Sequence, residues 1–250
     1  MPVRYQGTLA YDGTAYQGFQ RQAAGIPTIQ GAVENAFMTV SGQTVTVIGA
    51  GRTDTGVHAS GQVISFDLVW RHGVEQLLKA VNATLTPDIA LLRLEAAPHP
   101  AFHARFDATA RTYRYQVLNA DVRHPLFAHR AWHVWGQFDG VMMAQAAAML
   151  IGTHDFGAFG LPPQGDNTTR TIMRSEWTTQ ADDAGMLWHY TVEATAFLQH
   201  MVRRIVSVLV SLGRGMKSLD FFEAMLHQPL LRAGVTIAPP QGLTLTRVRY

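Results

Sequence analysis

The chain has 250 residues, of which 47% are hydrophobic and only 15% are charged. This length and composition exclude a disordered chain and suffice for one large domain or two smaller halves. The absence of cysteine excludes disulfides, thiolate catalysis and cysteine-ligated metals, whereas a net charge of +2 permits an RNA partner without indicating one.

Arginine supplies nearly all of the positive charge, since Lys79 and Lys217 are the only lysines. A guanidinium pairs bidentately with phosphate, but a GC-rich genome would produce the same bias, so both explanations stay open. No apolar run reaches the ~20 residues that a membrane helix needs, and residues 1–7 lack the apolar core of a signal peptide. We therefore expect a cytoplasmic protein without a membrane partner.

The first part of the chain predicts the element order β-α-β-β-α-β. Thr28 can cap a helix whose apolar residues recur at helical spacing from Ile29 to Phe37, and residues 74–81 repeat that spacing. The alternation typical of strands occurs at residues 3–11, 44–48, 62–68 and 89–95.

The second part predicts the same order again. Asp139 can cap a helix that Gly152 stops, a longer helix is predicted over 196–212, and a short extra helix follows Ser218. Strands are predicted at residues 112–118, 171–178, 187–195 and 243–249. The sequence therefore predicts an α+β fold of two duplicated ferredoxin-like halves, 1–105 and 106–250. Their sheets should be mainly antiparallel, with the helices on one face and the other face open for a large ligand.

The segment from Gly49 to His58 carries the strongest candidate for chemistry. It lies between two predicted strands and combines three glycines and two threonines with one cation, Arg52, and one carboxylate, Asp54. An Asp in such a loop can simply form a turn by bonding its own backbone. The alternative is that Asp54 acts on a substrate.

Several catalytic interpretations of this loop fail on spacing. Its glycines do not match a dinucleotide-binding loop, and no Gly-Lys-Ser/Thr follows for a nucleotide phosphate. The D-T-G triplet at 54–56 occurs once, whereas aspartic proteases need two carboxylates that share a proton. A two-carboxylate glycosidase lacks a partner, because the next acid, Asp67, lies along a strand. His58 and His103 belong to no metal-ligand pattern and are expected to be structural. A lone nucleophilic Asp54 beside an arginine remains.

Residues 51–59, followed by Gly61, Gln62 and Val63, resemble the catalytic segment of the TruA-type family of tRNA pseudouridine synthases. Further motifs of this family match in family order along most of the chain. They lie at residues 11–20, 102–115, 152–156, 170–172, 201–203 and 238–243.

This resemblance implies an isomerase that converts uridine to pseudouridine at positions 38 to 40 of the tRNA anticodon stem-loop, without metal or other cofactor. It places the nucleophile on Asp54 and the active-site tyrosine, which stacks on the uracil and can act as general base, on Tyr113. Arg203 matches the arginine that pairs with the carboxylate, and Arg52 matches one that contacts the RNA. The resemblance also implies a homodimer and an RNA cleft on the open face. Direct nucleophilic attack and a glycal pathway both stay open, as does the alternative of a non-catalytic RNA-binding module on the same fold.

Overall fold

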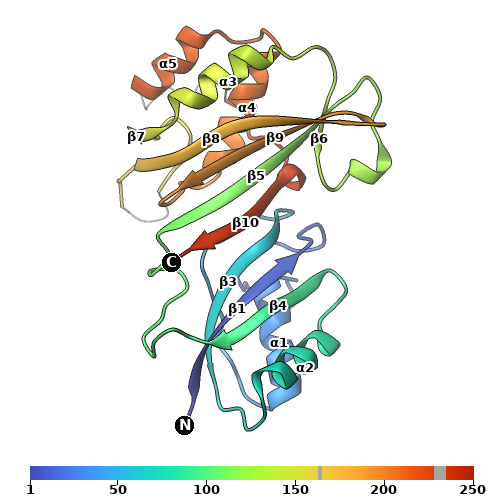
Figure 1. Ribbon diagram of the computed structural model, residues 1–250, viewed down its shortest axis with the longest axis vertical. Coiled ribbons are helices and arrows are strands. Elements are labelled where there is room, and N and C mark those ends of the chain that lie inside the picture. The colour runs from blue at the N-terminus through green and yellow to red at the C-terminus, as the bar shows by residue number, and fades with distance from the viewer. Residues whose placement is uncertain (163–164, 228–234) are drawn as a thin grey trace. The chain divides into compact units, whose positions relative to one another are not determined.

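The computed structural model describes residues 1–162, 165–227 and 235–250, and the chain divides into two compact units (Figure 1). Unit 1 comprises Met1–Arg111 and Thr244–Tyr250, and unit 2 comprises Thr112–Leu243. These units do not coincide with the expected halves, because unit 1 extends past residue 105 and also takes in the last strand of the chain.

The sheet of unit 1 is built around β1 (Val3–Tyr11). This strand pairs antiparallel with β3 (His58–Leu68) on one side and with β4 (Ile89–Ala96) on the other. The short strand β2 (Ile48–Gly49) pairs antiparallel with β3, and β10 (Leu243–Arg249) pairs with β3 in parallel. The expected order of elements in the first part of the chain is therefore confirmed.

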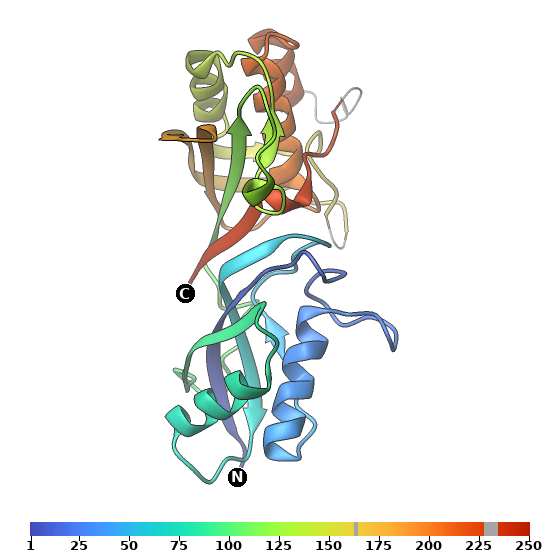
Figure 2. The same cartoon turned by 90° about the vertical axis from the view of Figure 1, so that its right-hand side faces the viewer.

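Two helices cover this sheet, and they contact each other (Figures 1 and 2). Helix α1 (Ile29–Ser41) begins at Thr28, whose side chain accepts a hydrogen bond from Gly31 N as expected of a cap. Helix α2 (Val74–Thr84) packs along β4. The ring of Phe37 on α1 lies 4.3 Å from that of Phe66 on β3, so the apolar face of the helix is buried against the sheet.

The strand expected at 44–48 is wrong apart from its last residue. Val45 and Val47 are buried, which produces the alternating pattern. The backbone of Val47, however, bonds to side chains of α1: its N–H donates to Glu34 Oε1 at 3.0 Å and its carbonyl accepts from Gln30 Nε2 at 3.1 Å. Helix side chains thus replace the strand partner that this segment would otherwise need.

In unit 2 the strands run in the order β5-β9-β8-β7. They are β5 (Ala110–Asn119), β9 (Gly185–Ala194), β8 (Thr169–Asp182) and β7 (Gly152–Asp155). Strand β8 pairs antiparallel with both β9 and β7. The short β6 (Trp132–Val134) lies parallel to β5. Strands β6 and β7 were not predicted, because they are too short to show an alternating pattern in the sequence.

The helices of unit 2 lie together on one side of these strands (Figure 1). Helix α3 (Gly140–Met149) begins at Asp139, whose carboxylate accepts from Met142 N, and it contacts β8, α4 (Met201–Gly213) and α5 (Leu219–His227). The expected cap at Asp139 and the extra helix after Ser218 are therefore confirmed. Short 3-10 turns occur at Pro125–Phe127 and Pro240–Gly242.

Two predicted boundaries in unit 2 are wrong. Helix α4 begins at Met201 instead of residue 196, because Gln199 N bonds to Leu161 O at 2.9 Å and His200 adopts a left-handed conformation with φ 61°. These features hold the preceding residues outside the helix. Gly152 does not stop α3, which ends at Met149; it begins β7 instead.

The described elements confirm the α+β class with mainly antiparallel strands. None of the helices in the described ranges has both the length and the apolar character that crossing a bilayer requires.

Candidate active site

Asp54 lies in the loop between β2 and β3, the part of unit 1 that the sequence singled out. Its side chain is half-buried, whereas Arg52 is exposed. The loop turns back at Gly56, whose φ of 75° favours glycine, and Val57 N donates to Asp54 O at 3.1 Å. The turn therefore restrains the backbone of Asp54 through its carbonyl.

Thr53, immediately before Asp54, is anchored on both its side chain and its backbone. Its hydroxyl lies 2.8 Å from the phenol oxygen of Tyr11, and its carbonyl accepts from Phe19 N at 3.0 Å. Both the hydroxyl of Thr53 and the ring of Tyr11 are buried. These bonds tie the loop to the end of β1 and to the segment that follows it.

Gln62 holds the start of the same loop from β3. Its side chain is completely buried; Nε2 donates to Gly51 O at 2.6 Å and Oε1 accepts from Gly51 N at 3.3 Å. A buried amide that satisfies both backbone groups of one residue leaves that residue little freedom. Gln62 thus fixes the backbone three residues before Asp54.

His58 ends the loop and is almost completely buried. Its Nδ1 lies 3.1 Å from Gly13 N and 3.0 Å from Asp12 Oδ1. The first contact requires a lone pair on Nδ1 and the second requires a proton, so one protonation state cannot satisfy both. Either contact joins the loop to the turn after β1. His103 likewise accepts two local backbone hydrogen bonds, so both histidines have the structural surroundings expected of them.

Tyr113 lies on β5 in unit 2, with only 8% of its surface exposed. The edge of one ring meets the face of the other where Tyr113 packs on Phe197, with 5.1 Å between ring centres and 88° between ring planes. This arrangement is a favourable aromatic geometry that restrains the ring. The phenyl of Phe197 is itself half-buried.

Arg203 lies in the first turn of α4 and is bound to a segment that precedes β10. Its Nε donates to Ala238 O at 2.7 Å, and Ala238 N donates back to Arg203 O at 3.2 Å. One of the five guanidinium N–H groups therefore serves this segment, while the other four belong to the two terminal nitrogens. The contact orients the guanidinium plane.

Tyr115, on β5, holds the same segment by a second bond. Its phenol donates to Pro239 O at 2.7 Å, and a Cβ at Gly242 would lie 2.6 Å from its ring, so this close approach requires glycine. Burial raises the pKa of Tyr115 well above its ordinary value, with Arg203 acting in the opposite direction. The phenol therefore stays protonated and continues to donate.

The structure thus places Asp54 and Arg52 in unit 1, and Tyr113 and Arg203 in unit 2. The pairing of Asp54 with Arg203 stays a prediction. Gln62 and Tyr115 lie in the family motifs, but their sequence context predicts no role for either residue. A polar residue beside the apolar run of β3 was the available signal for Gln62.

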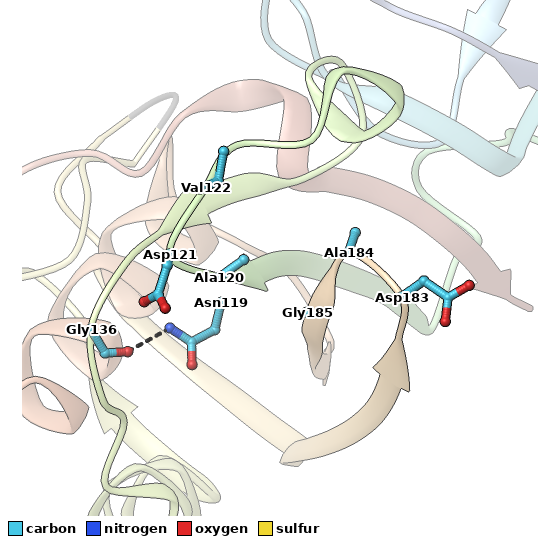
Figure 3. A pocket seen from close by; sticks show the side chains of 8 residues that line it. All are labelled: Asn119, Ala120, Asp121, Val122, Gly136, Asp183, Ala184 and Gly185. Atoms are coloured by element: carbon cyan, nitrogen blue, oxygen red, sulfur yellow. Dashed lines mark hydrogen bonds between the residues drawn. The ribbon is translucent and has the colours of Figure 1, made fainter.

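An open pocket of about 380 Å³ lies elsewhere in unit 2 (Figure 3). The tip of the β8–β9 hairpin and the segment after β5 line it, and its charged groups are the carboxylates of Asp121 and Asp183. Asn119 in its wall is engaged in the fold, since its Nδ2 donates to the carbonyls of Val134 and Gly136 at 2.9 and 2.8 Å. Two carboxylates would repel a phosphate, so this pocket is no candidate for binding RNA.

Metal ligation has no support in the described ranges. Within residues 1–162, 165–227 and 235–250, no three His, Asp or Glu side chains gather closely enough to hold a metal ion.

Comparison with known proteins confirms the family resemblance. A family model described as tRNA pseudouridine synthase matches residues 8–107 and 146–250. The tRNA pseudouridine synthase A of Neisseria meningitidis serogroup C is 41% identical over 249 residues, covering 99% of this chain and 92% of the relative. Proteins of the same name from Chloroflexus aurantiacus and Rhodospirillum rubrum are 41% and 39% identical. They cover 97% and 99% of this chain and 87% and 88% of their own lengths.

These matches include the candidate residues to different extents. Arg52, Asp54 and Arg203 lie inside the segments that the family model matches, whereas Tyr113 lies between those segments. The relatives align over nearly the whole chain.

Proposed function

Because the chain belongs to the family of tRNA pseudouridine synthases, we propose that it converts uridine to pseudouridine at positions 38 to 40 of the tRNA anticodon stem-loop. The observation that carries this proposal is the Asp54 loop. Its motif lies within the matched segment, and buried side chains of unit 1 hold the residues that directly precede the half-buried Asp54.

Asp54 is the proposed nucleophile. The N1–C1′ bond of uridine breaks, and the uracil leaves with the bonding electrons while the carboxylate attacks C1′ or assists formation of a glycal. The uracil then turns, C5 bonds to C1′, and the proton on C5 is lost. The product is an isomer of the substrate, so the reaction needs no oxidant and no second substrate.

Tyr113 is proposed to stack on the uracil and to accept the C5 proton as general base. Its burial and its edge contact with Phe197 support this assignment, because they restrain the ring. Replacing Tyr113 by Phe should keep the stacking surface but slow release of the C5 proton. A slow step of this kind is detected as retained tritium when the transcript carries 5-tritiated uridine.

Arg203 is proposed to pair with Asp54 and orient it, with its guanidinium plane set by the bond to Ala238 O. Arg52, which is exposed beside the nucleophile, is proposed to contact the RNA backbone and help to hold the flipped nucleotide. A base inside a stem has to leave the stack before a side chain can reach its ribose, at a cost of a few kcal/mol.

We also propose that the protein works in the cytoplasm as a homodimer, as the family resemblance implies. Several large apolar side chains of unit 2 are exposed, which supports a further protein contact: Val122, Leu126 and Val141. Sedimentation velocity measures the association state directly.

Incubation of the purified protein with an unmodified tRNA transcript, followed by mapping of pseudouridine, tests the proposed function. We expect pseudouridine only at positions 38 to 40, and an unchanged rate when EDTA is present. Transcript binding without any pseudouridine would indicate the non-catalytic RNA-binding module instead. Loss of activity in EDTA would contradict the cofactor-free mechanism.

A further inference from the structure

Phe106 is a large apolar residue of unit 1 that the fold leaves in solvent. It is 74% exposed, and it follows the buried Phe102 and Ala104 in the segment that leads to β5. The imidazole of His103 stacks on its ring with 4.3 Å between ring centres and 29° between planes. The guanidinium of Arg105 lies 5.6 Å from the centre of the same ring.

The turn that presents Phe106 is rigidly built. His103 Nδ1 accepts from the backbone N–H groups of Arg105 and Phe106 at 3.2 Å each. Asp107 closes the turn, since its N–H donates to His103 O and its carboxylate accepts from His103 N. The exposed ring is therefore held in place by the fold, which is unusual for an aromatic side chain that buries little of its own surface.

The same turn is tied to the sheet of unit 1. Ala104 N donates to Ser65 Oγ at 3.2 Å, and Ala104 O accepts from the phenol of Tyr250 at 2.7 Å. The ring of Tyr250 packs on Phe102, with 4.9 Å between ring centres. Both sides of the residue preceding Arg105 are thus anchored.

Arg111 joins the turn directly to the loop that carries Asp54. A single terminal nitrogen, Nη2, donates to Ala50 O at 2.9 Å and to Arg105 O at 2.6 Å. Ala50 precedes Asp54 by four residues, which span at most ~14 Å of chain. A bound RNA strand a few nucleotides long can therefore span the distance between the ring of Phe106 and the carboxylate of Asp54.

We propose that Phe106 and Arg105 form a nucleotide platform, on which a base of the tRNA neighbouring the modified uridine stacks while Arg105 pairs with its phosphate. This inference rests on the proposed function. An aromatic ring binds any base through its π-face, and a guanidinium supplies the complementary charge for the backbone. His103 and Arg105 place polar groups against the ring, whereas contact with a second protein copy would favour apolar surroundings.

Replacement of Phe106 by Ala tests the platform, with Phe106→Tyr as the conservative variant and Trp135→Ala as the control. Trp135 is 64% exposed, and the guanidinium of Arg214 lies 5.1 Å from the centre of its ring, so it is a similar pair of aromatic ring and arginine. Arg214 lies at the C-terminal end of α4, whereas Arg203 lies in the first turn of that helix. We expect Phe106→Ala to raise the Kd and KM for transcript at least tenfold, with kcat changed less than twofold. Phe106→Tyr and Trp135→Ala should bind as wild type does.

The salt dependence of binding separates the two parts of the platform. Arg105→Gln should reduce the slope of log Kd against log salt by about one phosphate contact, and Phe106→Ala should leave it unchanged. The proposal would be overturned if Phe106→Ala bound tRNA with the wild-type Kd. It would also be overturned if sedimentation velocity showed that Phe106→Ala dissociates a dimer while its affinity for tRNA is unchanged. If the wild type binds tRNA but forms no pseudouridine, a weakened Phe106→Ala still supports the platform while the proposed function fails.

Discussion

The Asp54 loop of unit 1 and the Tyr115–Arg203 region of unit 2 are held by different means. In unit 1, buried polar side chains bond to the loop, as with Gln62 on both backbone groups of Gly51. In unit 2, backbone carbonyls of one segment receive the bonds that Arg203 and Tyr115 donate. Asp54 is thus fixed through the backbone of its loop, whereas Arg203 is fixed through its side chain.

This difference predicts how each region tolerates change. A side chain that carries chemistry on a fixed backbone can be altered without moving its neighbours, so its loss should affect the reaction alone. A side chain that also holds a neighbouring segment affects both the reaction and the local structure.

Asp54→Asn should lower kcat by at least ~10³-fold, because an amide cannot act as the nucleophile. Because buried bonds at Gly51 and Thr53 and the backbone carbonyl of Asp54 hold the loop, the free energy of unfolding and the Kd for tRNA should stay close to wild type. Pseudouridine mapping, urea unfolding and equilibrium binding measure the three quantities. A variant that still modified transcripts at the wild-type rate would remove Asp54 from the mechanism.

Arg203→Lys should lower kcat by ~10²-fold, because an ammonium keeps the charge but loses the planar fork. It should also lower the free energy of unfolding by ~1 kcal/mol, since the bond to Ala238 O is lost. Arg204→Lys on the next position of α4 is the matched control and should retain most activity. Equal losses for the two variants would contradict a particular role for Arg203.

Gln62→Leu should lower kcat about tenfold and the free energy of unfolding by ~2 kcal/mol, because both backbone groups of Gly51 lose their buried partner. Gln43→Leu is a matched control, since Gln43 bonds the N–H and carbonyl of Val69 in the same way at an exposed site. Gln43→Leu should change kcat less than twofold. An equal loss of kcat in Gln62→Leu and Gln43→Leu would show that Gln62 has no particular part in positioning the loop.

Sequence reasoning located the Asp54 loop because its residues are consecutive, and it found the helix starts at Thr28 and Asp139 because capping is a local property. It misplaced the strand at 44–48 because the partners of Val47 are side chains on α1. It also misplaced the start of α4, where Gln199 bonds to Leu161. The contacts of Tyr115 with Pro239 and Gly242, which we call the Tyr115 clamp, join positions more than 120 residues apart in the sequence. No local sequence pattern could therefore reveal them.

Tyr115→Phe should give the smallest effect, which appears in the pH dependence of stability. Burial raises the folded-state pKa of Tyr115 above that of the unfolded chain, so the stability it contributes is complete below pH ~10 and falls as pH rises further. Removing the phenol should therefore make the decline in the free energy of unfolding between pH 10 and 11.5 shallower, by up to ~1.4 kcal/mol per pH unit. Urea unfolding across this range measures the slope.

Tyr190→Phe separates this electrostatic effect from the clamp. Burial also raises the pKa of Tyr190. The phenol oxygen of Tyr190 lies 2.7 Å from Ser175 Oγ, whereas that of Tyr115 bonds to the segment that Arg203 binds. Both variants should therefore flatten the alkaline decline, but only Tyr115→Phe should also lower kcat at pH 8, because it releases Pro239 beside Arg203. An equal loss of kcat in both variants would show that general destabilisation of unit 2 lowers kcat, and not the loss of the Tyr115 clamp.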